Sequence, residues 1–159
     1  MKTPTTTSHK PVIISENYDK VDGRFAQSSD AKSLSLGLTQ WNDQGKFALS
    51  AKVWGNTGEQ RTRQLEELPL HRFLDLSIMI CRSIAHFRDA YRYEHFYDPQ
   101  KPVIDRIGLQ GAAMTVAVNT DNERINEDMK LFSQALSADD ELIGERLRAL
   151  SRMLKEMGY

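Results

Sequence analysis

Hydrophobic and polar residues alternate along two neighbouring stretches of the chain, 33–41 and 46–54, which the segment NDQG separates. Because successive side chains of a strand point to opposite faces, this period of two predicts a β-hairpin closed by a four-residue loop. One face of the hairpin collects the apolar residues and is expected to face the core. These residues are Leu34, Leu36, Leu38, Phe47, Leu49, Ala51 and Val53.

The other face of the hairpin carries small residues, lysines and two tryptophans. The loop length fixes the register, and residues directly opposite each other share a face. Because charged lysines resist burial, we expect this face to stay at least partly exposed to water. The expected pairs are Ser33 with Trp54, Ser35 with Lys52, Gly37 with Ser50, and Trp41 with Lys46.

Further strands are expected on both sides of the hairpin. The segment PVIISENY (11–18) has the composition of a short strand. A turn at GNTG (55–58) is expected to lead into a return strand at 59–67. The segment MTVAVNT (114–120) follows two glycines and predicts another strand.

The longest helix is expected from Leu70 to about Phe96. This stretch contains no Gly or Pro, its apolar residues recur with helical spacing, and Pro69 suits the first turn of a helix. The prolines of YDPQKP (97–102) cannot continue it. Its end carries the aromatic cluster YRYEHFY (91–97), which indicates a subunit contact or a lid over the core.

Two helices are expected to close the chain, at about 121–136 and 138–157. Both carry apolar residues with 4-3-4 spacing, which favours docking onto the protein's own core or onto a second copy of the chain. The residues with N-cap spacing are Thr120 with Glu123, and Ser137 with Asp140. The apolar residues of the last helix are Ile143, Leu147, Leu150, Leu154 and Met157.

These elements predict an α+β fold, in which an antiparallel sheet of about three to five strands packs against a long central helix and two C-terminal helices. A chain of 159 residues fits one domain. We expect residues 1–10 to form a flexible arm and residues 11–159 to form a single domain that self-associates into a homo-oligomer.

Composition and charge then limit the function classes. With 21 Lys and Arg against 22 Asp and Glu, the net charge of −1 excludes a protein that coats nucleic acid by charge alone. No apolar run approaches a membrane span, so no membrane partner is expected. The single cysteine, Cys81, lies in the apolar run SIMICRSIA and is interpreted as an inert buried thiol. Together these features predict a cytoplasmic protein.

The hairpin face is the leading candidate for a binding site. Residues 1–63 carry nine Lys and Arg against six Asp and Glu, so the front part of the chain is basic. Single-stranded nucleic acid is held by aromatic side chains that stack on bases and by cations that meet phosphates. The alternative is an inner layer, in which a helix or a partner's sheet covers both tryptophans. The candidate nucleic-acid-binding residues are Trp41, Lys46, Lys52, Trp54, Arg61 and Arg63.

Two resemblances accompany these residues. The hairpin, the glycine-bearing turn, the basic return strand and a helix begun by ELPLHR resemble, over about 33–85, the single-strand-binding transcriptional coactivators and their plant Whirly relatives. That resemblance implies nucleic-acid binding on the sheet face of a dimer or larger assembly, although no dense lysine run precedes the hairpin here. Through SLGLTQWN, SAKVW, EELPLHR, DRIGLQG and LSRMLKEMGY, the whole chain resembles a bacterial family of uncharacterised proteins, which implies no activity.

A small-ligand or catalytic site is the third interpretation. His71 and Asp75 stand four residues apart on one helix face, where a carboxylate can orient a base. The sequence places no nucleophile beside them, so the protein is interpreted as a non-catalytic binding protein, with a homo-oligomeric scaffold as the alternative. No cofactor is assigned, and no metal-ligand spacing is present. The residues of the small-ligand alternative are Asp22, Arg24, Asp30, Lys32 and His71.

Overall fold

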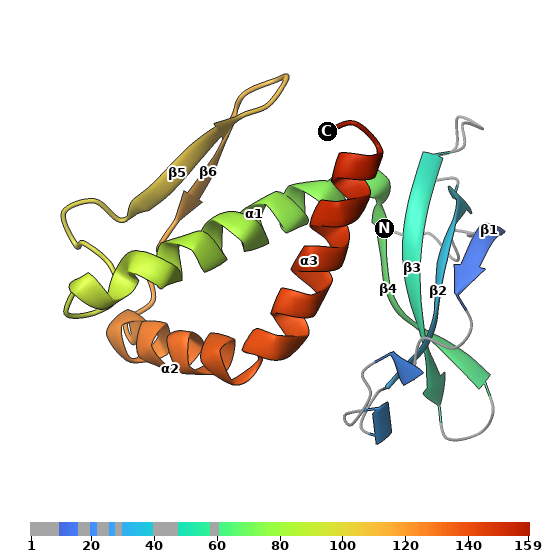
Figure 1. Cartoon of the computed structure of the whole chain (residues 1–159), viewed down its shortest axis with the longest axis horizontal. Helices are drawn as coiled ribbons and strands as arrows, with labels where there is room; N and C mark the ends of the chain where they lie inside the picture. The colour runs from blue at the N-terminus through green and yellow to red at the C-terminus, as the bar shows by residue number, and fades with distance from the viewer. Residues whose placement is uncertain (1–9, 16–19, 22–25, 28–29, 40–47, 58–60) are drawn as a thin grey trace, which may run out of the picture. The chain divides into compact units, whose positions relative to one another are not determined.

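The computed structural model describes residues 10–15, 20–21, 26–27, 30–39, 48–57 and 61–159 (Figure 1). It contains antiparallel sheets, one long helix and two C-terminal helices, so the predicted α+β class is confirmed. The chain divides into two compact units, Met1–Leu76 and Ser77–Tyr159. The expectation that 11–159 forms a single domain stays a prediction.

The first unit is built on a four-stranded antiparallel sheet, in the order β1-β2-β3-β4 (Figure 1). The short strand predicted at 11–18, the two arms of the hairpin and the return strand at 59–67 are all present as strands. The alternating sequences of the two central strands give each of them one apolar face. The strands are β1 (Lys10–Ser15), β2 (Ala31–Thr39), β3 (Ala48–Thr57) and β4 (Arg61–Pro69).

The prediction of a turn at 55–58 is wrong for residues 55–57, which belong to β3. Gly55 pairs with Arg63 and Thr57 pairs with Arg61, so β3 continues to Thr57. Glycine and asparagine favour turns locally, but the hydrogen bonds of the ladder between β3 and β4 outweigh that preference. Residue 58 lies outside the described residues.

The long helix α1 (Leu70–Asp89) ends earlier than the predicted Phe96. A short 3-10 helix, η3 (Ala90–Arg92), follows it directly. Neither Gly nor Pro marks this boundary, which is why the sequence pattern runs past it. Pro69, predicted in the first turn of the helix, is instead the last residue of β4.

The apolar face of the sheet lies where the alternation predicts it. Leu34 pairs with Val53 across the two central strands, and both line a hollow of about 430 Å³ to which Phe73 of α1 also contributes. Leu36, on the same hollow, keeps 45% of its surface exposed, so this face is only partly covered.

The second unit contains a two-stranded antiparallel sheet of β5 (Val103–Gly108) and β6 (Ala113–Ala117) (Figure 1). The strand predicted at 114–120 corresponds to β6. The sequence pattern does not predict β5, because a β-bulge between Val103 and Asp105 breaks the alternation on which such a prediction rests.

The two C-terminal helices, α2 (Ile125–Ala138) and α3 (Asp140–Glu156), confirm the predicted helices but not their caps. The N-cap of α2 is Arg124 and that of α3 is Asp139, and neither makes a side-chain capping hydrogen bond. Helix α2 runs on past the serine that was expected to start the next helix, because continuing a helix adds one backbone hydrogen bond per residue. The N-cap predictions for Thr120 with Glu123 and for Ser137 with Asp140 are therefore wrong.

The core of the second unit is a small cluster. Tyr97, Val118 and Met129 are buried together, and four partly buried apolar side chains pack against them. The ring of Phe87 from α1 also stacks on that of Phe132 from α2, with centroids 5.0 Å apart. The four packing side chains are Phe87, Phe96, Ile104 and Ile125.

The aromatic cluster YRYEHFY divides between the core and the surface. Tyr97 is buried and Phe96 packs on the core, as expected of a lid. Tyr91 is 80% exposed.

The expectation that Cys81 is buried is wrong. Its side chain is exposed and carries a free thiol. An uninterrupted apolar run on a helix places residues on every side of the axis, and only one side of α1 packs on the core.

Candidate functional site

The hairpin face has the register that the sequence predicts. Ser33 pairs with Trp54, and Ser35 pairs with Lys52. The third described pair, Gly37 with Ser50, is also confirmed. On this face of β2 and β3, a row of small residues therefore lies beside Lys52 and Trp54, the two described candidates for ligand binding on these strands.

Lys52 and Trp54 contact each other within this face. The Lys52 Nζ atom lies 4.5 Å from the centroid of the Trp54 ring, which is a cation–π contact. Lys52 keeps 5% of its surface exposed and Trp54 is half-buried. The expectation that this face is open because its lysines resist burial is therefore wrong at Lys52. The reason is that β3 is a central strand and an aromatic face stabilises the ammonium group there.

The remaining candidates for nucleic-acid binding do not gather around Trp54. Trp41 and Lys46 lie outside the described residues. Arg61 and Arg63 belong to β4, where their positions pair with Thr57 and Gly55. Because faces alternate along a strand, these register positions are out of phase with Trp54, which pairs with Gln64.

The residues of the small-ligand alternative are also scattered. Asp22 and Arg24 lie outside the described residues, and Lys32 is placed only as a backbone position of β2. Asp30 is exposed just before that strand, and His71 is exposed in the first turn of α1. Asp75 makes no hydrogen bond to His71, although the structure describes both side chains.

The second half of α3 exposes a continuous apolar surface, which we call the α3 stripe. Leu150, Leu154 and Met157 continue the 4-3-4 spacing that the sequence shows for this helix, and Met153 lies on the same side. Ile143 and Leu147, in the first half of the same seam, are half-buried. They line a hollow of about 390 Å³ together with Phe87. The α3 stripe consists of Leu150, Met153, Leu154 and Met157.

A polar hollow in the second unit contains residues that the sequence reasoning missed. It has a volume of about 350 Å³ and lies among the end of α1, η3 and the start of β5. The aromatic cluster YRYEHFY lies in this segment, but the residues that indicate a polar site are the charged residues within and around the cluster. These charged residues are Arg82, Asp89, Arg92, Asp98 and Lys101.

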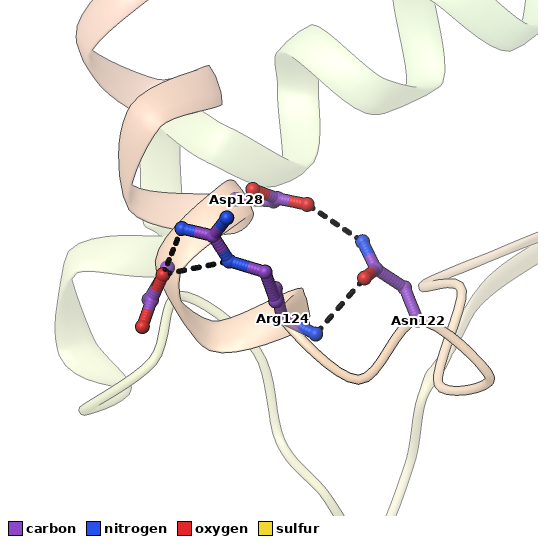
Figure 2. A network of polar contacts seen from close by, with 4 residues as sticks. Asn122, Arg124 and Asp128 are labelled. Carbon is purple, nitrogen blue, oxygen red and sulfur yellow. Dashed lines mark hydrogen bonds and ion pairs between the residues drawn. The ribbon is translucent and has the colours of Figure 1, made fainter.

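A polar network holds the start of α2 (Figure 2). The side chain of Asn122 accepts a hydrogen bond from the backbone N–H of Arg124 at 2.9 Å and donates one to Asp128 at 2.7 Å. The Arg124 guanidinium donates to Glu127 at 2.6 and 3.0 Å. This hydrogen bond, together with the charges of Glu127 and Asp128, raises the pKa of Arg124 above its usual value. These contacts link the residues before α2 to its first turn, at an exposed end of the helix.

The part of the chain that the structure describes contains neither a group of metal ligands nor a membrane-spanning helix. Within residues 10–15, 20–21, 26–27, 30–39, 48–57 and 61–159, no three His, Cys, Asp or Glu side chains are grouped so that they could hold a metal ion. Within the same ranges, no helix has both the length and the hydropathy needed to cross a membrane.

The described architecture defines an α+β protein with a four-stranded antiparallel sheet, a separate β-hairpin and three helices. The chain belongs to a family of unknown function, DUF6530, whose model matches residues 1–159. Comparison with curated proteins and with solved structures gives no match.

Proposed function

We propose that the protein is a non-catalytic interaction protein that self-associates through the α3 stripe. The observation that carries this proposal is the exposure of that stripe. Leu150 is 44% exposed, Leu154 is 41% exposed and Met157 is 69% exposed. Single apolar residues on a surface are ordinary, but a continuous exposed apolar patch is typical of an interaction site.

A second copy of the chain suits this stripe better than an unrelated partner. Symmetric dimers need a patch that is complementary to itself, and an apolar seam with heptad spacing has this property. The stripe also continues a seam whose first half, at Ile143 and Leu147, is half-buried.

The charges of α3 favour an antiparallel pair. Acidic residues occupy its first two turns, and basic residues predominate from Arg146 onward, with Glu156 as the exception at the end. Two antiparallel copies bring each acidic half toward a basic one, whereas parallel copies bring like charges together. The acidic residues are Asp140, Glu141 and Glu145, and the basic residues are Arg146, Arg148, Arg152 and Lys155.

The test is the mass of the protein in solution. Sedimentation at micromolar concentration is expected to give a species heavier than the 18.2 kDa monomer. Leu150→Asp and Leu154→Asp are expected to shift the protein toward the monomer, because each places a charge inside the apolar contact.

The matched control is Leu131→Asp, which makes the same change at an exposed leucine of α2 outside the stripe. It is expected to leave the mass unchanged. A parent protein that sediments only as a monomer removes the proposal. So does an oligomer that both stripe variants leave intact.

The second candidate function is binding of single-stranded nucleic acid on the hairpin face. It is supported by the half-buried Trp54, which pairs with Ser33 beside a row of small residues that lets a flat base approach. The resemblance to single-strand-binding coactivators points the same way. Because Lys52 already contacts the Trp54 ring, we expect stacking to contribute more than ion pairing.

The test is titration of tryptophan fluorescence with mixed single-stranded oligonucleotides at low salt. Trp54→Ala is expected to weaken binding by about 1–3 kcal/mol. Tyr91→Ala, at an exposed aromatic residue outside the sheet, is the control and is expected to change nothing. Failure to bind, or binding indifferent to Trp54→Ala, leaves self-association as the only proposed function.

A further inference from the structure

The polar hollow of the second unit has the size of a small-molecule site. Its volume of about 350 Å³ falls at the lower end of the range of ligand pockets, roughly 300–1,000 Å³. Its wall is built from α1, η3, the segment that follows η3, the first residues of β5, and Val118 after β6.

Charged side chains of both signs line the hollow without neutralising one another. Arg92 and Lys101 bring positive charge, and Asp89 brings negative charge. Among the described residues, none of these three takes part in an ion pair. The guanidinium of Arg92 lies 5.2 Å from the centroid of the Tyr93 ring, which orients it while its N–H groups stay available.

Two other charged groups of the hollow are already committed. The Arg82 Nε atom lies 2.8 Å from the carboxylate of Asp105. One carboxylate oxygen of Asp98 accepts the backbone N–H of Gln100 at 2.9 Å. The groups left to meet a ligand are therefore two cations and one free carboxylate, supported by the second oxygen of Asp98.

His86 adds a polar group whose orientation is fixed. Its Nε2 atom lies 2.9 Å from the carbonyl oxygen of Phe96, and since a carbonyl can only accept, Nε2 carries the donated hydrogen. With the hydrogen on Nε2, the acceptor of that tautomer is Nδ1. Both His86 and the residue after Phe96, Tyr97, line the hollow.

The backbone is strained at Phe96, the residue before Tyr97 of the lining. Its φ of 66° lies in the left-handed region, which is unfavourable for a bulky residue. Packing of the Phe96 side chain on the core offsets the cost. Strained residues of this kind concentrate at ligand sites, because strain is retained where a wall must hold one shape.

We propose that this hollow binds a small zwitterion of the α-amino-acid class. The carboxylate of the ligand meets Arg92 and Lys101, and its ammonium group meets Asp89. A simple anion would face the carboxylates of Asp89 and Asp98, and a simple cation would face the two basic side chains. Only a ligand that carries both charges satisfies both sets of groups.

The test is isothermal titration calorimetry of the full chain with alanine, serine and glutamine as free amino acids. Acetate and ethylamine, each of which carries one of the two charges, are the comparison ligands. The amino acids are expected to bind at least about tenfold more tightly than either, because each comparison ligand loses one charge-assisted contact.

Substitutions inside and outside the hollow test whether the amino acids bind there. Arg92→Gln and Asp89→Asn are each expected to weaken amino-acid binding about tenfold. Arg106→Gln and Asp121→Asn remove exposed charges outside the hollow and are expected to leave binding unchanged. Thermal unfolding of each variant separates lost binding from lost folding.

Three results would overturn the proposal. The first is the absence of binding by all three amino acids. The second is equal affinity for acetate and alanine, because that result would show that the hollow binds simple anions. The third is amino-acid binding that folded Arg92→Gln and Asp89→Asn leave unchanged.

Discussion

The ammonium group of Lys52 lies 4.5 Å from the centre of the Trp54 ring, and the lysine is almost entirely buried. A buried charge is costly unless it is compensated, so the ring supplies part of what water would otherwise provide. We therefore expect this contact to stabilise the sheet whether or not a ligand binds.

We expect Lys52 and Trp54 to be energetically coupled. A double-mutant cycle with Lys52→Met and Trp54→Leu is expected to give a coupling free energy of about 1–2 kcal/mol, since the contact is desolvated. The measurement is denaturant unfolding of the four proteins. Additive effects of the two substitutions would show that the ring does not stabilise the ammonium group.

Met129 is expected to be important for the stability of the second unit, whose buried cluster is small. Met129→Ala should lower the free energy of unfolding by about 2–4 kcal/mol, because it leaves a cavity. Leu131→Ala, on the same helix but 57% exposed, is the control and should cost far less. Equal losses at the two positions would mean that Met129 is not a core residue.

Asn122, rather than the predicted Thr120, is expected to stabilise the start of α2. Asn122→Ala should cost about 1 kcal/mol, because its hydrogen bonds to Arg124 at the N-cap and to Asp128 in the first turn are lost. Thr120→Ala is the control. A larger loss at Thr120, measured by thermal unfolding, would restore the capping box that the sequence suggested.

Gly144 is expected to be a site where stability can be gained. A Cβ atom there would lie 3.0 Å from the guanidinium end of Arg148, which is flexible and can move away. Gly144→Ala should therefore raise the free energy of unfolding by about 0.5–1 kcal/mol through helix propensity. The reverse change at Ala149 on the same helix should lower it. Destabilisation by Gly144→Ala would indicate that Arg148 is held in place.

The elements that could be predicted from the sequence are those set by local periodicity. The register of β2 with β3, in which Ser33 pairs with Trp54, follows from strict alternation and loop length. The class of the fold and the two C-terminal helices follow from the same kind of pattern.

The features that could not be predicted depend on tertiary structure. Helix α1 ends at Asp89 without a local stop signal, ahead of a segment in which Phe96 adopts a left-handed backbone and packs on the core. The burial of Lys52 depends on its place in a central strand and on the Trp54 ring. The polar hollow joins residues from several elements, so no single spacing in the sequence reveals it.

Helix α1 belongs to both units, because the boundary between Leu76 and Ser77 falls inside it. An isolated helix shorter than about 12–15 residues is marginal in water, so a cut at this boundary leaves the first unit with an end that cannot hold its helical form alone. Melting of the helix from either side should therefore lower the stability of both units, and amide hydrogens on the two sides of Leu76 should exchange in one cooperative opening. We therefore expect the two units, each compact by itself, to share one step of unfolding.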